Sequence, residues 1–94
     1  MFSGGSYDEV ARWLKNFLTS HAKREHVRAE VDLDAGEERE GKSYEARVRL
    51  GDRVSAPIEF PFAEVAQQRG SLEWCARCAA RVREVVRDLE SAAA

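Results

Sequence analysis

Three short segments of this chain alternate apolar and polar residues without a break. Their apolar members are Val27, Ala29, Val31 and Leu33; then Tyr44, Ala46, Val48 and Leu50; then Val54, Ala56, Ile58 and Phe60. Strict alternation indicates β-strands with one buried and one solvent-exposed face. We therefore expect three strands, at about residues 26–33, 43–50 and 54–60.

The segment before the strands has the period of an amphipathic helix. Ser6 and Glu9 form a capping box, in which each side chain can bond a backbone N–H of the other residue. The apolar stripe that follows consists of Val10, Trp13, Leu14, Phe17, Leu18 and His21. This spacing predicts a helix at about 7–22, with Tyr7 at its margin.

Two further helices are expected after the strands. A short one begins at Pro61 and ends before Gly70, and a longer one, capped by Ser71, spans about 72–91. The predicted core face of the longer helix is Leu72, Cys75, Ala76, Ala79, Val82, Val86 and Leu89, and a second apolar strip, Trp74, Cys78 and Val85, flanks it.

Together these elements predict a two-layer α+β fold of the order α-β-β-β-(α)-α. The antiparallel sheet has strand order 1-2-3, and the helices pack on one of its faces. A three-residue turn is expected to place Leu50 opposite Val54, and Pro57 marks the third strand as an edge strand. We expect residues 1–5 to be disordered, 6–91 to form one domain and 92–94 to fray.

Composition limits the function classes. The 94 residues carry a net charge of −2, which argues against nucleic acid and anionic membrane as partners. The sequence has neither a signal peptide nor a run of about 20 apolar residues, so we expect a cytoplasmic protein that does not cross a membrane. The two cysteines lie three positions apart and do not form a disulfide framework.

The segment Trp74-Cys75-Ala76-Arg77-Cys78 resembles the redox motif of the thioredoxin family. The resemblance implies that the first cysteine, Cys75, is a reactive thiolate stabilised by a helix N-terminus, and that Cys78 is the second thiol of the redox pair. In that family the motif follows a strand, whereas here a short helix precedes it. We therefore favour a packing role, with Cys75 facing the core and Cys78 at its edge.

A tetrahedral zinc site is a further reading, with His21, His26, Cys75 and Cys78 as the four ligands. The two histidines and the two cysteines lie far apart in the sequence, and His21 falls on an apolar helix stripe. We predict no metal site and no cofactor.

The element order, over about 85 residues, is similar to that of the double-stranded-RNA-binding domain. The resemblance implies contacts to duplex RNA from the first helix, the first hairpin loop and a lysine cluster at the start of the last helix. Here the loop carries Asp34, Glu37, Glu38 and Glu40 beside Arg39 and Lys42. The last helix begins with Ser71-Leu72-Glu73-Trp74 and has no lysine there. RNA binding therefore stays an alternative.

We predict a non-enzymatic protein-interaction or self-associating module, since no catalytic motif is evident. Its partner is not identified by the sequence. A homodimer through the last helix is expected, with Trp74, Cys78, Val85 and Trp13 as interface candidates. Trp74→Arg should then yield a folded monomer. The alternatives are an RNA-binding domain and a small thiol-redox protein that uses Cys75 and Cys78.

Overall fold

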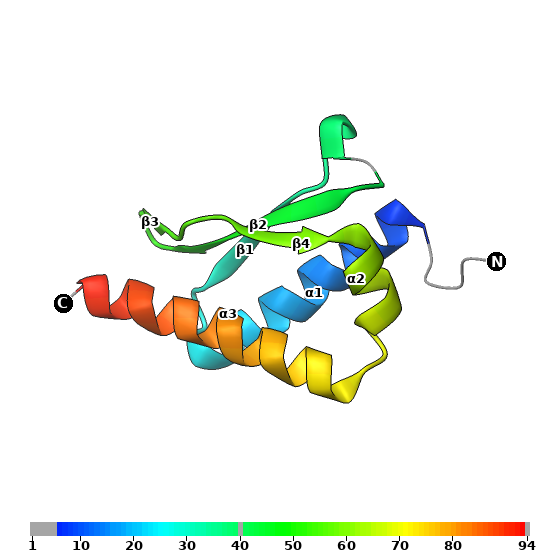
Figure 1. Cartoon of the computed structure of the whole chain (residues 1–94). Helices are drawn as coiled ribbons and strands as arrows, with labels where there is room; N and C mark the ends of the chain where they lie inside the picture. The colour runs from blue at the N-terminus through cyan, green and yellow to red at the C-terminus, as the bar shows by residue number, and fades with distance from the viewer. Residues whose placement is uncertain (1–5, 40, 94) are drawn as a thin grey trace.

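Two long helices lie beneath one antiparallel sheet in the computed structural model (Figure 1), which describes residues 6–39 and 41–93. The elements are α1 (Tyr7–Glu25), β1 (Glu30–Asp34), the 3₁₀ helix η1 (Glu37–Arg39), β2 (Ser43–Leu50), β3 (Arg53–Val54), β4 (Ile58–Pro61), α2 (Phe62–Gln68) and α3 (Leu72–Ala93). The predicted α+β class and the order β1-β2-β3 are confirmed, and β4 pairs with β2 beside β3. The prediction of disorder at 1–5 concerns residues outside the described ranges.

The start of α1 is capped as predicted, because the Glu9 N–H donates to Ser6 Oγ over 3.1 Å. The helix continues three residues beyond its predicted end. Its fully buried side chains are Val10, Leu14, Leu18 and Ala22, while Trp13, Phe17 and His21 are half-buried along one flank. Val27 follows the helix in a turn and is 76% exposed, so its predicted place on a buried strand face is wrong.

The third predicted strand is divided by a β-bulge. Arg49 pairs with Val54, whereas Ala46 pairs with Ile58. Because the Ser55 N–H bonds the Val48 carbonyl, Arg47 alone lies opposite two residues, Ala56 and Pro57, which is a bulge. Ser55 stabilises it, since its N–H donates to the Val48 carbonyl and its Oγ accepts from the Val48 N–H, at 2.8 and 2.9 Å.

Because of this bulge, the register of the hairpin differs from the predicted one. Leu50 pairs with Arg53, not with Val54, across the two-residue turn Gly51-Asp52. Gly51 has a φ of +66°, and a two-residue turn with this backbone favours glycine at its first central position. A shift of one residue reverses which face a side chain points to, so Val54 and Ala56 are exposed rather than buried.

The core contains a pair of tyrosines that joins the start of α1 to β2. The rings of Tyr7 and Tyr44 stack with centroids 4.5 Å apart. The Tyr44 hydroxyl donates to the Tyr7 carbonyl over 2.7 Å, and the Tyr7 hydroxyl donates to the Ser43 carbonyl over 2.5 Å. Burial raises the pKa of Tyr44. Tyr7 is therefore a core residue and not, as predicted, a residue at the helix margin.

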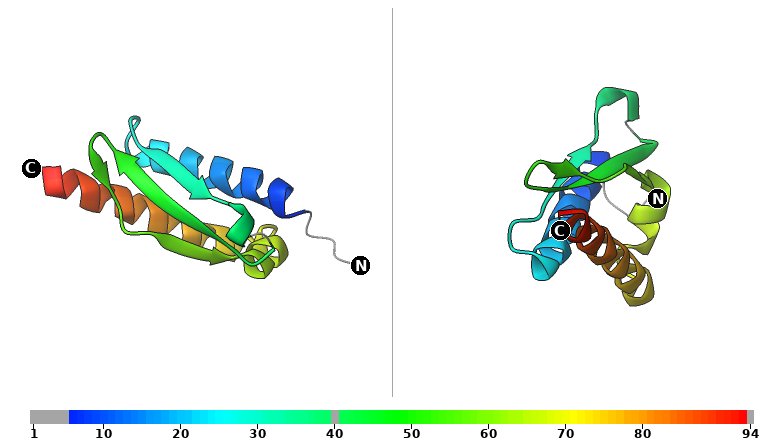
Figure 2. Two further views of the ribbon diagram at one scale, coloured as in Figure 1. Left: turned by 90° about the horizontal axis from the view of Figure 1, so that it is seen from above. Right: turned by 90° about the vertical axis from the view of Figure 1, so that its left-hand side faces the viewer.

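Helix α3 runs beside α1 in the same direction (Figure 2). Trp74 lies against Trp13 near their N-terminal ends, and Glu25 at the end of α1 pairs with Arg83 and Arg87. The prediction of which face of α3 is buried is wrong at the start of the helix. Leu72 is 88% exposed and Ala76 is exposed as well, while the buried side chains of the helix are Trp74, Val82 and Val86. The helix continues to Ala93, into the segment 92–94 that we expected to fray.

Candidate functional site

A groove of about 450 Å³ lies between the bulged outer strand and the C-terminal half of α3. The left view of Figure 2 shows this strand running alongside the helix. The apolar lining comes from Val54, Ala56, Pro57 and Ile58 of the strand and from Val85 and Leu89 of α3. Arg81 and Asp88 contribute charges to the groove. The groove is thus an apolar surface with charged groups beside it.

The free edge of β4 offers few hydrogen-bond donors. The Phe62 N–H donates to the Lys42 carbonyl, so alternate residues of the strand direct their backbone groups toward β2. The intervening positions Pro57, Glu59 and Pro61 direct theirs away from the sheet. Two of these three are prolines, which have no N–H. This edge is poorly suited to the addition of another strand.

The opposite face of the sheet carries charges that pair with one another. Arg49 binds Asp32 at 2.9 Å and Glu30 at 3.3 Å, across β1 and β2. The hydrogen bond from Arg49 holds the pKa of Asp32 below its usual value. Arg47 binds Glu45 at 2.9 Å. Ion pairs therefore account for these charges on the exposed face of the sheet.

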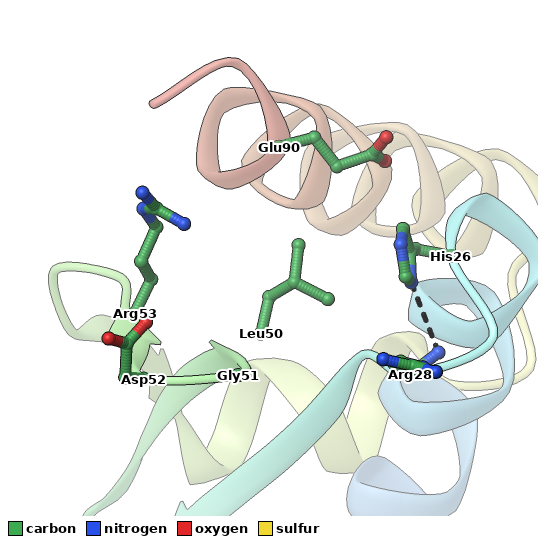
Figure 3. Close-up of a pocket in the computed structure, with 7 residues that line it drawn as sticks. All are labelled: His26, Arg28, Leu50, Gly51, Asp52, Arg53 and Glu90. Carbon is green, nitrogen blue, oxygen red and sulfur yellow. Dashed lines mark hydrogen bonds between the residues drawn. The ribbon is translucent and has the colours of Figure 1, made fainter. Parts of the chain in front are cut away.

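A second cavity of about 360 Å³ lies between the β2–β3 hairpin, the segment after α1 and Glu90 of α3. Figure 3 shows Leu50 between the residues of the β2–β3 hairpin and Glu90. The Arg28 N–H donates to His26 Nδ1 over 3.1 Å. The wall carries charges of both signs from Arg28, Asp52, Arg53 and Glu90, which form no ion pair within the described ranges. A single leucine under mixed charges offers little apolar area to a ligand.

The two cysteines of the motif lie partly within the protein. Cys75 Sγ donates to the Arg69 carbonyl over 3.4 Å, and both thiols are free and half-buried. Burial raises the pKa of Cys78 to about 11. A thiol with a raised pKa is a weak nucleophile at neutral pH, so Cys78 is not suited to be the attacking thiol.

The four residues considered for zinc do not come together. The ring of His21 packs edge-on against Phe17, with centroids 4.7 Å apart. Its pKa is lowered by burial, and Arg24 and Arg83 lower it further. His26 lies beside Glu90, which follows Cys78 by twelve positions, or about 18 Å along a helix. Residues 6–39 and 41–93 contain no group of three or more His, Cys, Asp or Glu side chains placed to hold a metal.

The four predicted interface residues form two pairs: Trp74 with Trp13, and Val85 with Cys78. Trp74 is 4% exposed, its Nε1–H donates to Glu64 over 3.0 Å, and its ring faces the half-buried Trp13 at 6.3 Å. A guanidinium introduced by Trp74→Arg would therefore lie in the core rather than on an interface. Val85 lies in the groove, and Cys78 is half-buried. Val85 is thus the candidate that the structure places at an open surface.

Positive charge is concentrated on the outer side of α1. Its exposed cations are Arg12, Lys15, Lys23 and Arg24, and no acidic residue lies between them in the sequence. The first hairpin loop is different, since Arg39 is engaged by Asp34 at 3.3 Å and Glu45 at 2.8 Å. Of the loop acids named above, Glu40 and the side chain of Glu37 lie outside the described part. The start of α3 exposes Leu72 and Glu73.

No family model, no curated protein and no solved structure matches this chain. None of the helices within the described ranges is both long and apolar enough to cross a membrane. The functional interpretation of the site therefore rests on the geometry of this chain alone.

Sequence reasoning missed most of the groove. The alternating pattern predicts Val54 and Ala56 on a buried strand face, whereas both are exposed. The signal that could have located the groove is Pro57, because proline inside a strand marks either an edge or a bulge. A bulge at this point turns Val54 outward.

Proposed function

We propose that this chain is a non-enzymatic protein-interaction module whose contact surface is the groove between the bulged strand and α3. The observation that carries the proposal is the apolar lining of the groove, where the half-buried Val85 and Leu89 of α3 lie across from Pro57 and Ile58 of the strand. Apolar surface with charged groups at its margin is typical of the centre of a protein interface. The ion pairs on the opposite face of the sheet leave that face less suited to the role.

The mode of binding follows from the strand edge. With Pro57 and Pro61 in place, an incoming strand would find one outward backbone donor between them, that of Glu59. Burial of apolar side chains must then supply most of the affinity. A helix that lays its apolar face into the groove meets this requirement.

Site-specific photo-crosslinking in intact cells tests this function. A benzophenone side chain replaces Pro57 in the groove or, as a matched control, the exposed Ala80 on the outer side of α3. We expect the adduct from position 57 to identify a protein that also binds the purified chain, with binding lost in Val85→Arg. Equal crosslinking from both positions, or a purified pair that does not bind, would contradict the proposal.

Duplex RNA is a second candidate partner, supported by the four exposed cations of α1, which have no acidic residue between them in the sequence. Under this alternative a fluorescent RNA duplex should bind at low salt, with affinity falling steeply as salt rises and with loss of binding in Lys15→Glu. Absence of binding at low salt would remove this candidate.

A further inference from the structure

Four exposed charged residues form a stripe along α3 beside the groove. These residues, Arg77, Arg81, Glu84 and Asp88, are spaced by three or four positions and so share one face of the helix. The two cations lie in the N-terminal half of the stripe and the two anions in the C-terminal half. We call these four residues the α3 stripe.

Contacts within one chain do not explain this segregation. Arg77 and Arg81 are like charges four positions apart, as are Glu84 and Asp88, and such pairs destabilise a helix. Arg77 bonds the neighbouring Glu73 over 3.1 Å. Within the described ranges, the other three stripe residues form no ion pair.

We propose that the occupant of the groove is a second copy of this chain, whose α3 lies antiparallel to the first. This inference rests on the proposed function, which makes the groove the contact surface. Antiparallel packing sets the cations of one stripe against the anions of the other, whereas parallel packing opposes like charges. Both copies then present the same surface, as a two-fold dimer requires.

The apolar part of the surface fits the same arrangement. Val85 lies between Arg81 and Asp88 and therefore comes close to the two-fold axis. In this position each Val85 can pack against the α3 of the other copy, next to Pro57 and Ile58 at the wall of its own groove. The stripe sets the orientation, and the apolar contacts supply the burial.

Charge reversal tests the proposal. Arg77→Glu/Arg81→Glu makes the stripe uniformly negative, and Glu84→Lys/Asp88→Lys makes it uniformly positive. In sedimentation equilibrium we expect each double variant to raise the dissociation constant of the dimer about tenfold or more. An equimolar mixture of the two should form a heterodimer. The variant with all four changes should dimerise like the unmodified chain, because its reversed stripe is again self-complementary.

A matched control separates this pattern from general attraction between opposite charges. Arg12→Glu/Lys15→Glu makes the same change in net charge on α1. It should leave dimerisation intact and should not pair specifically with the positive double variant. Equal pairing by this control, or a quadruple variant that associates no better than the doubles, would overturn the antiparallel dimer. Circular dichroism at low concentration establishes that each variant is folded.

The two proposals fail in different ways. If the unmodified chain is monomeric while position 57 crosslinks to another protein that binds the purified chain, the groove is an interaction site and the second-copy proposal is wrong. If the chain dimerises and neither Val85→Arg nor the stripe variants weaken the dimer, the groove is not the contact surface, and both proposals are wrong.

Discussion

At the scale of single residues, the structure separates two side chains that share the apolar stripe of α1. Leu14 is fully buried, whereas Phe17 is half-buried, with its ring stacked on Trp13 at 5.0 Å. We expect Leu14→Ala to lower the free energy of unfolding by about 2–5 kcal/mol and Phe17→Ala by about 1–2 kcal/mol. Urea denaturation measures both. A larger loss for Phe17→Ala would contradict the placement of the helix face.

The thiol of Cys78 gives a second prediction at this scale. Because burial raises its pKa to about 11, the thiolate should be scarce at neutral pH. In Cys75→Ser, which leaves one thiol, the alkylation rate should keep rising with pH up to about 11. A rate that reaches its plateau below pH 8 would contradict the burial of this thiol.

At the scale of elements, the β2–β3 hairpin depends on one glycine. Gly51 adopts a φ of +66°, a conformation that side chains with a Cβ rarely occupy. Gly51→Ala should destabilise the fold by about 1–2 kcal/mol, while Asp52→Ala, at the exposed next position, should cost less. Thermal and urea unfolding compare the two variants. Equal stability of the two would show that the turn is built differently.

The junction of α1 and α3 should depend on pH. Hydrogen bonds from Arg83, at 3.1 Å, and Arg87 lower the pKa of Glu25. A carboxyl group whose pKa is lowered by folding stabilises the folded state above its ordinary pKa, and this stabilisation is lost as the pH falls through the lowered value. Glu25→Gln should therefore reduce the melting temperature at pH 7 and have progressively less effect as the pH falls below 4. A difference that persists at pH 2 would show that the ion pairs are not its cause.

Sequence periodicity predicted the existence and order of the elements but not the phase of two of them. The apolar residues of α3 cover more of the helix circumference than the protein buries. Packing against α1 and the sheet therefore decides that Trp74 is buried and Leu72 exposed. In the third strand, alternation continues through Val54 and Ala56 although the bulge reverses their direction. The predicted interface helix contributes Val85 to the groove, but the groove itself depends on the bulge. The tertiary contacts that decide both phases are invisible in a local pattern.

At the scale of the whole molecule, the helices cover one face of the sheet and ion pairs occupy the other, while the strand–α3 groove is an apolar opening of about 450 Å³. The central claim is that this groove and the α3 stripe form the contact surface of the chain. Amide NMR spectra of the unmodified chain, recorded during dilution, test it most directly. We predict that the signals of residues 54–58, Pro57 excepted, and of 77–92 shift together, while those of the outer side of α1 stay constant. Signals that do not change on dilution, or that change on α1 instead, would contradict the account.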